Sequence, residues 1–280
     1  MRILVIGGTG KVGSSVVAGL RAMGHDAVIA ARKPGPGGIV LDMRDSAAVK
    51  RVAAGFDAAF FATPLGPDES DVGVAIVAAL RAAGVKRIVY LGIMNLVAMR
   101  EIPHFETKIP VRAAVLAADG TVVEANFFFQ NDAMMLPATL HGGVYPMPVG
   151  SAGVWSVDTG DIGDAAARAL TMDDWQGQAV PLCGPDRLTG PLMAQVWSDA
   201  LGRPVTYGGD DIAPFVGMLS QIIPGFGPWE ANDFAVMMRV TQDHGCPATP
   251  VDIAASEAIV GRPLRRYREF VSALIEGQAA

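Results

Sequence analysis

The sequence predicts an α/β fold: a doubly wound parallel sheet followed by a smaller, mostly helical C-terminal lobe. Three observations predict it. Short β-branched runs alternate with helical patterns through the first half of the chain, as in successive strand–helix–strand units. The runs are largely apolar, which is typical of strands buried on both faces of a parallel sheet. A glycine-rich turn separates the first run from the first helical pattern, so the sheet is expected to begin there.

The elements of the first half are expected in regular order. Residues 3–7 form the first strand, and residues 11–24 form a helix that ends on glycine, as helices commonly do. A Pro/Gly turn over 33–38 follows the second strand. The further strands are expected at 26–31, 39–43, 57–63 and 87–93, and the further helices at 46–55 and 72–84.

The regular alternation weakens after residue 94. Residues 120–131 indicate a sixth strand that runs into a phenylalanine-rich loop, and residues 178–184 indicate a strand at the sheet edge. Much of the remainder is expected to be helical, with Pro/Gly loops between helices, at 186–202 and 211–240.

Composition and charge exclude several classes of function. The net charge of −6 opposes a phosphate backbone, so no nucleic acid partner is expected. The arginine-rich segment 262–270 also contains Glu269 and is expected to be a solvated helix face. Cys183 and Cys246 lie far apart and form no C-x-x-C, so we expect reduced thiols and no metal site. The chain starts in a strand and has no apolar run of membrane-spanning length, which predicts a cytoplasmic protein without a membrane partner.

The glycine-rich turn over residues 7–13, GGTGKVG, predicts a dinucleotide site. Gly7 permits the tight turn, Gly10 admits a diphosphate close to the backbone, and Gly13 allows close helix packing. The N-terminus of the following helix adds N–H donors and a partial positive charge. The context makes residues 1–150 a Rossmann-type domain and residues 151–280 a smaller substrate lobe, with the strand near 178–184 returning to the main sheet. The expected contacts from the turn are Gly7, Thr9, Gly10, Lys11, Val12 and Gly13.

The end of the second strand selects the dinucleotide. A site that prefers NAD carries a carboxylate there to bind the ribose 2′-hydroxyl. Here the strand ends in Ala30 and Ala31, followed by Arg32 and Lys33. An arginine fork suits a 2′-phosphate, and the lysine is a second cation. NADP(H) is therefore the predicted cofactor; the alternative is that both side chains are merely solvated, with little selectivity.

Several motifs together resemble the NmrA-like family of atypical short-chain dehydrogenases/reductases. The resemblance spans nearly the whole chain and rests on the order and spacing of the motifs. These are the 7–13 turn, Arg32, Asp42, His104-x-x-x-Lys108, Asp161-Ile162, and Leu188-Thr189 followed by residues 200–205.

The resemblance implies NADP(H) bound in an extended pose, with a substrate cleft between the domain and the lobe. It places Asp42 and Met43 beside the adenine. It places Ala62, Thr63 and Pro64 along the middle of the cofactor. It also places five residues near the nicotinamide: Gly92, Ile93, Asn126, Phe127 and Phe128.

The catalytic residues of ordinary short-chain dehydrogenases are missing. None of the four tyrosines has a lysine four positions later, so the tyrosine proton donor of that mechanism is absent. His104 and Lys108 remain as catalytic candidates: Lys108 would bind ribose hydroxyls, and His104 would exchange a proton. Pro110 predicts that the helix begins with Thr107 as its cap, which leaves His104 in the preceding loop. The alternatives are a solvated lysine and a histidine that lies in the loop or supports the site without touching the reacting atoms.

The substrate side of the cleft is predicted from composition. The sixth strand carries Glu124-Ala125 where the family commonly has Arg-Pro, so the relatives' substrate contacts are not carried over. Aromatic and methionine side chains suit a flat apolar ligand. The candidates for the cleft wall are Phe127, Phe128, Phe129, Met134, Met135, Trp155, Phe215, Met218, Trp229, Met237 and Met238.

Three functions are consistent with these features. The first is an NADPH-dependent reductase that transfers a hydride to a hydrophobic aromatic, quinone-like or conjugated carbonyl substrate. The second is a non-catalytic NADP(H)-sensing regulator that binds a protein partner. The third is an isomerase or lyase that retains the nucleotide as a structural ligand. Whether the chain forms a homodimer stays open.

Overall fold

The computed structural model describes residues 1–279 and confirms the predicted α/β class. Seven parallel strands form one sheet in the order β3-β2-β1-β4-β5-β6-β8. This order reverses next to the first strand, as in a Rossmann-type sheet. The strands are β1 (Arg2–Ile6), β2 (Asp26–Ala31), β3 (Ile39–Val40), β4 (Ala58–Phe61), β5 (Arg87–Ile93), β6 (Thr121–Ala125) and β8 (Ala179–Leu182).

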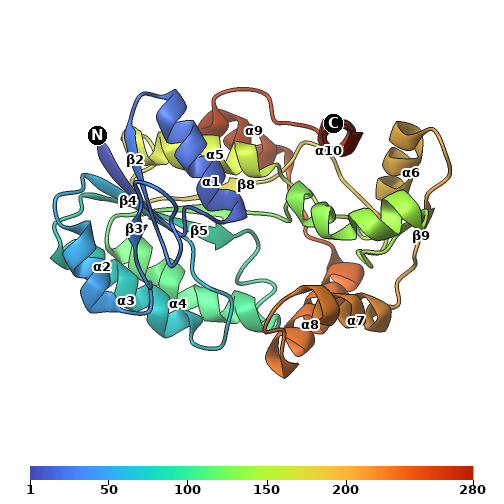
Figure 1. Ribbon diagram of the computed structural model, residues 1–280, viewed down its shortest axis with the longest axis horizontal. Coiled ribbons are helices and arrows are strands. Elements are labelled where there is room, and N and C mark those ends of the chain that lie inside the picture. Colours follow the sequence, from blue (N-terminus) through green and yellow to red (C-terminus); the bar gives the residue numbers. More distant parts are fainter. Residues whose placement is uncertain (280) are drawn as a thin grey trace.

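Helices cover both faces of the sheet (Figure 1). The strands are buried on both sides, and every residue of β4 is buried, because each helical layer contributes its own apolar core. Six helices form the two layers. One layer contains α1 (Lys11–Ala22), α5 (Thr159–Thr171) and α9 (Pro250–Val260), and the other contains α2 (Ser46–Ala53), α3 (Glu69–Ala82) and α4 (Pro103–Ala117).

The remaining elements form a lobe beside the carboxyl ends of the strands, with a third apolar core (Figure 1). The chain enters the lobe after β6, returns to the sheet for α5 and β8, and crosses three more times before its end. A two-stranded parallel sheet pairs β7 with β9 inside the lobe. The lobe elements are the 3₁₀ segment η1 (Phe129–Met135), the π-helical turn η2 (Pro137–His141), β7 (Val144–Tyr145), α6 (Gly190–Leu201), β9 (Thr206–Tyr207), α7 (Ile212–Ile222), α8 (Pro228–His244) and α10 (Tyr267–Ala279).

Helix α4 begins earlier than the sequence predicted. It starts at Pro103, contains His104 in its first turn and continues through Pro110, so the expected start at Thr107 is wrong. Pro103 suits the first helical position. The carboxylate of Asp233 on α8 accepts the backbone N–H of His104 at 2.8 Å, and this distant side chain replaces the local cap that the prediction required.

The arginine-rich segment near the C-terminus is not a solvated helix face. Most of it precedes α10, which begins at Tyr267. Arg262 and Arg265 both bind the fully buried carboxylate of Asp161 on α5. Helix α5 was itself not predicted, although it packs on α1 and completes one layer of the sheet. These ion pairs tie that layer to the start of α10.

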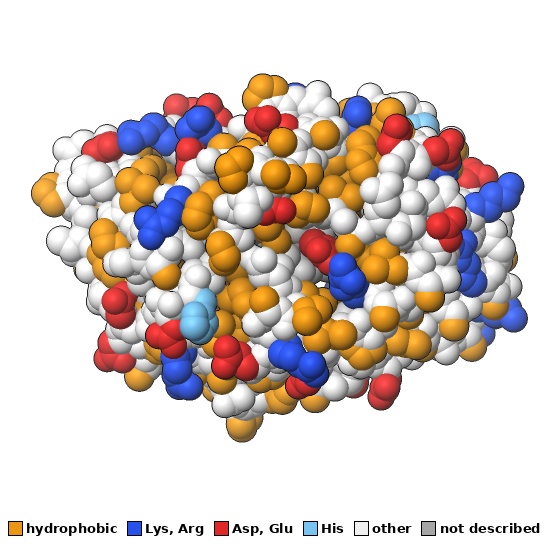
Figure 2. Space-filling view, turned by 180° about the vertical axis from the view of Figure 1, so that it is seen from behind, with side chains coloured by type: hydrophobic (Ala, Val, Ile, Leu, Met, Phe, Trp, Pro, Cys, Tyr) orange, Lys and Arg blue, Asp and Glu red, His pale blue; other side chains and the backbone are white. Residues whose placement is uncertain are grey.

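The surface mixes charges of both signs. Figure 2 shows one face, on which acidic and basic side chains are interspersed with apolar ones. Within residues 1–279, no helix combines the length and the apolar character that crossing a membrane requires.

Candidate functional site

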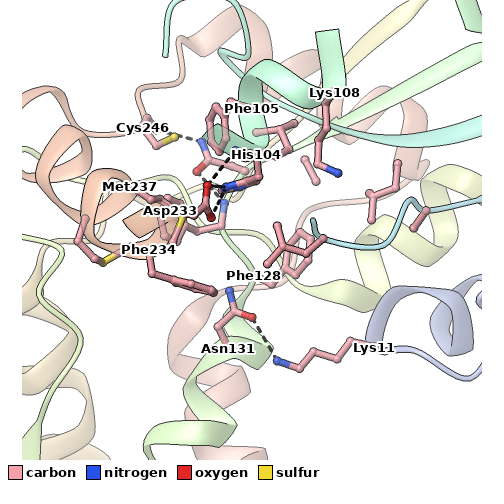
Figure 3. A pocket seen from close by; sticks show the side chains of 18 of the residues that line it. Lys11, His104, Phe105, Lys108, Phe128, Asn131, Asp233, Phe234, Met237 and Cys246 are labelled. Carbon is pink, nitrogen blue, oxygen red and sulfur yellow. Dashed lines mark hydrogen bonds and ion pairs between the residues drawn. The ribbon is translucent and has the colours of Figure 1, made fainter. Parts of the chain in front are cut away.

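Two cavities meet at the carboxyl ends of the strands. The first, which we call the polar cavity, has a volume of about 540 Å³ and borders the glycine turn. The second, the apolar cavity, has a volume of about 430 Å³ and lies between the sheet and the lobe (Figure 3). Neighbouring residues line different cavities: Gly10 and Pro64 line the polar cavity, and Lys11 and Thr63 line the apolar cavity. The cavities therefore adjoin along one elongated cleft.

The glycine turn has the geometry that a phosphate-bearing ligand requires. Gly7 has a φ of +79°, a conformation that favours glycine. A Cβ on Gly13 would lie 2.2 Å from the Gly7 carbonyl oxygen. Gly10 caps α1 without a side-chain hydrogen bond, and the first turn of α1 holds no acidic residue. The helix N-terminus is thus available to an anion, and the turn fits a diphosphate.

The polar cavity carries three cations. Arg32 and Lys33 line it, as predicted for a 2′-phosphate site, and Arg44 lines it as well. The Arg44 guanidinium donates two hydrogen bonds, of 2.9 and 3.2 Å, to the Asp68 carboxylate, which holds it in place. Arg44 was not among the predicted cofactor contacts. It directly follows Asp42 and Met43, which were predicted, so its position in the sequence could have indicated it.

The structure distributes the predicted cofactor contacts over both cavities. Val12 and Gly13 line neither, because both are buried in the first turn of α1. The polar cavity is lined by Gly7, Thr9, Gly10, Arg32, Lys33, Asp42, Met43 and Pro64. The apolar cavity is lined by Lys11, Ala62, Thr63, Gly92, Ile93, His104, Lys108, Asn126, Phe127 and Phe128.

Some of these side chains already have partners in the protein. The Asn126 amide donates to the Cys246 carbonyl oxygen at 3.0 Å and accepts from the Phe127 backbone. Lys11 donates to Asn131 Oδ1 at 3.2 Å across the cleft (Figure 3). Burial lowers the pKa of Lys11. Lys11 therefore presents a partly desolvated cation where the two cavities meet.

Lys108 lies in a buried polar cluster that the sequence analysis did not foresee. Its ammonium pairs with the fully buried Glu69 on α3 and donates to Thr63 Oγ1 at 3.1 Å. Thr107 also donates to Glu69, at 2.7 Å, and Tyr90 Oη lies 3.1 Å from Thr63 Oγ1. Burial penalises the charge of Lys108, but Tyr90 and the Glu69 carboxylate together outweigh that penalty, so the pKa of Lys108 is raised above its ordinary value. Lys108 is therefore a fixed cation at the cavity wall.

His104 also faces the apolar cavity, from the first turn of α4. Its Nδ1 lies 2.7 Å from Asp233 Oδ2 and 2.9 Å from Asp233 Oδ1. In Figure 3 the ring and the carboxylate point toward one another, and Asp233 comes from α8 of the lobe. Sequence reasoning missed Asp233 because 129 positions separate it from His104.

The apolar wall contains part of the predicted set. Phe129 and Met135 are almost fully buried in the lobe core instead, and Phe129 packs against the ring of Tyr267. Trp155, Met218 and Trp229 also lie outside the lining. The predicted residues that line it are Phe127, Phe128, Met134, Phe215, Met237 and Met238, and the unpredicted ones include Leu65, Phe105, Met147, Ile223, Phe234 and Cys246.

Comparisons with known proteins agree with this architecture. The model of the NmrA-like family matches residues 1–271. An NAD(P)H azoreductase from Xenophilus azovorans is 31% identical over 97% of this chain and 97% of its own. Among solved structures, an Escherichia coli NADPH-dependent quinone oxidoreductase complexed with NADPH superposes with a TM-score of 0.81 and 22% identity, covering 98% of this chain and 99% of that one. A Citrobacter triphenylmethane reductase complexed with NADP(H) superposes with a TM-score of 0.80 and 21% identity, covering 98% and 99% of the two chains.

Proposed function

The chain belongs to the NmrA-like family, and on that premise we propose that it is an NADPH-dependent reductase of hydrophobic, conjugated acceptors such as quinones and azo compounds. One observation carries the proposal: a polar, cation-lined cavity and an apolar cavity adjoin end to end at the strand ends. The first suits a phosphorylated nucleotide and the second a flat acceptor. The relatives named for azoreductase and quinone reductase activity support the same class of substrate.

In this proposal the cofactor extends along both cavities. Arg32, Lys33 and Arg44 would surround the 2′-phosphate, because all three line the polar cavity. Asp42 and Met43 would lie beside the adenine, and the glycine turn would hold the diphosphate. The E. coli and Citrobacter proteins, which share the fold, were solved with NADPH and NADP(H).

The nicotinamide end would lie against Thr63, Gly92 and Lys108, where the bound cofactor supplies a hydride. The Lys108 ammonium has three protons, and two of them have partners among residues 1–279, in Glu69 and Thr63. In this proposal a ribose hydroxyl would accept the third proton, beside the Tyr90 side chain that also faces Lys108. The role of Lys108 is thus to position the cofactor with a cation that Glu69 holds in place.

The acceptor would occupy the apolar cavity, whose aromatic and methionine walls can adjust to different flat molecules. The partner in this proposal is therefore a small hydrophobic substrate. We also place the protein in the cytoplasm, because its two cysteines are buried free thiols, which are common where disulfides do not persist.

The test follows NADPH oxidation with a panel of quinones and azo compounds, together with NADPH affinity by calorimetry. Replacing Lys108 alone strands the Glu69 charge, so Lys108→Met is compared with the double variant Glu69→Gln/Lys108→Met. We expect both to lose about 10- to 100-fold in kcat/KM, the worth of one charged hydrogen bond. The exposed Lys50→Met serves as the matched control.

Tight NADPH binding without turnover of any acceptor would contradict the reductase. That result would favour the NADP(H)-sensing regulator instead. An unchanged rate in the double variant would remove Lys108 from the proposed site and leave the reductase proposal standing.

A further inference from the structure

A carboxylate of the lobe holds the His104 ring, and among residues 1–279 it has no other cationic partner. Asp233 is completely buried, and among residues 1–279 its ion pair is with His104. Both carboxylate oxygens lie within hydrogen-bond distance of Nδ1, at 2.7 and 2.9 Å. A buried carboxylate requires a donor or a positive charge beside it. Asp233 therefore favours the ring orientation and tautomer in which Nδ1 carries a proton.

The orientation of the ring leaves one nitrogen for a ligand. A carboxylate only accepts, so Nδ1 is the donor in this contact and Nε2 is the other ring nitrogen. The ring also packs edge-on against Phe105, with 4.7 Å between the ring centroids. His104 lines the apolar cavity and retains 12% of its side-chain exposure. Because Nδ1 is bound to Asp233 and the residue lines the cavity, Nε2 is the ring nitrogen left for an acceptor there.

We infer that Asp233 is a positioning residue that makes His104 the proton donor to the acceptor, an inference that rests on the proposed function. Reduction of an N=N or conjugated C=O acceptor takes one hydride and one proton, and NADPH becomes NADP+. The hydride bonds to one atom of the acceptor, and the π-electron pair moves to the atom at the other end. That atom takes the proton from His104 Nε2. The ring is left neutral with Nδ1–H on Asp233, and one proton taken up from bulk solvent restores Nε2–H, so each turnover consumes one NADPH and one solvent proton.

Asp233 has a second role that decides which variants are informative. Its Oδ1 also accepts the backbone N–H of His104 and so caps α4. An alanine would remove both the cap and the ring partner, and its effect would be ambiguous. Asp233→Asn retains an oxygen acceptor and removes the charge, and Asp233→Glu restores the charge at a greater reach. His104→Gln removes the ring and leaves the cap in place.

The first test compares two kinds of acceptor in the NADPH-loaded enzyme. A neutral quinone or azo compound requires a proton, whereas a triarylmethyl cation becomes a neutral product by accepting a hydride alone. We expect Asp233→Asn and His104→Gln to lower kcat at least tenfold more for the neutral acceptor than for the cation, because a positioned acid contributes about 10²–10⁴-fold. KM for NADPH should stay within about twofold, and Asp233→Glu should recover part of the rate.

The matched control is Asp243→Asn, an exposed carboxylate on the same helix, for which wild-type rates are expected on both acceptors. Equal losses on the neutral and cationic acceptors would overturn the inference, since a purely structural role would slow both. A rate on the neutral acceptor that Asp233→Asn does not change would overturn it as well.

The second test needs no turnover. The chain has four histidines, so nitrogen-15 NMR of the rings in the cofactor-free protein is assignable with His104→Gln. We expect a protonated, strongly deshielded Nδ1–H for His104, which shifts upfield in Asp233→Asn. Absence of this signal would contradict the pairing. A normal signal in an enzyme that reduces no acceptor would overturn the reductase proposal and the donor role together, whereas the selective kinetic result above concerns the donor alone.

Discussion

Lys108 and Glu69 form a buried ion pair, so a substitution at Lys108 affects the stability of the protein as well as its function. Both side chains are removed from water, and the ammonium is neutralised within the protein. Removing one partner of such a pair typically costs about 3–5 kcal/mol, because a buried charge is left alone. A functional variant at Lys108 is therefore interpretable only with Glu69 changed at the same time.

Arg32 differs from Lys108 because its side chain is exposed. It lines the polar cavity beside Lys33 and Arg44, and a guanidinium can bind a phosphate through two parallel hydrogen bonds. Its contribution is thus expected in ligand binding, with little effect on stability.

Replacing Arg32 with alanine is expected to weaken NADPH binding about 10- to 100-fold and NADH binding far less. A charge-assisted hydrogen bond contributes about 1.5–3 kcal/mol, and NADH lacks the phosphate that would receive it. Calorimetric titration of both nucleotides measures the ratio. The exposed Arg51→Ala on α2 is the control, and an unchanged NADPH-to-NADH ratio in Arg32→Ala would refute the 2′-phosphate assignment.

Helix α4 carries the proline where helices tolerate it least. Pro110 lies inside the helix and is exposed, so it lacks the N–H that would bond to the Glu106 carbonyl four positions earlier. Pro103 lies at the first helical position, where a missing N–H costs nothing. Pro110 is thus expected to lower the stability of the helix, whereas Pro103 is not.

Pro110→Ala is expected to raise the free energy of unfolding by about 1–2 kcal/mol. The gain combines a restored helix hydrogen bond with the loss of ring strain, less the entropy that alanine adds to the unfolded chain. Urea unfolding measures it. Pro103→Ala should show no such gain, and destabilisation by Pro110→Ala would contradict the expected cost of this proline.

At the scale of the whole molecule, the site exists because the chain crosses repeatedly between the sheet and the lobe. Strand β8 and helices α5 and α9, from the second half of the chain, complete the layers of the sheet. The division into residues 1–150 and 151–280 stays a prediction. The apolar cavity takes its walls from both parts, with Lys108 on one side and Asp233 and Met237 on the other.

A buried carboxyl joins three segments of the lobe. Asp132 on η1 accepts hydrogen bonds from Tyr145 on β7, at 3.1 Å, and from Tyr267 on α10. Trp197 donates to the Tyr267 oxygen at 2.9 Å. Burial raises the pKa of Asp132 to about 6. The folded lobe therefore holds this proton more tightly than the unfolded chain does.

The free energy of unfolding is expected to depend on pH because the folded and unfolded states bind the Asp132 proton with different affinities. Well below pH 4 both states bind it; as the pH rises through 4 toward 6, the unfolded chain releases it while the folded chain keeps it, so the stability contributed by Asp132 falls by on the order of 3 kcal/mol. Asp132→Asn should remove this part of the pH dependence, as measured by urea unfolding across pH 4–7. The exposed Asp174→Asn is the control. Parallel pH profiles for the wild-type protein and Asp132→Asn would contradict the raised pKa.

The sequence by itself determined the features that depend on local backbone chemistry. The glycine turn needs particular φ values and close approaches within seven residues, and Arg32 follows directly from the end of a strand, so both were predictable. The alternation of apolar runs and helical patterns predicted the sheet for the same reason, since burial on both faces shows in each strand separately.

Only the tertiary structure decided which charged groups meet. Asp233 caps α4 and holds His104 from a helix that folds over it, Glu69 pairs with Lys108, and Asp161 binds the arginines before α10. Each pair joins segments between 39 and 129 positions apart. No local pattern encodes such a contact, because its energy exists only after the packed layers have excluded water from both groups. The start of α4 and the proposed proton donor both depend on contacts of this kind.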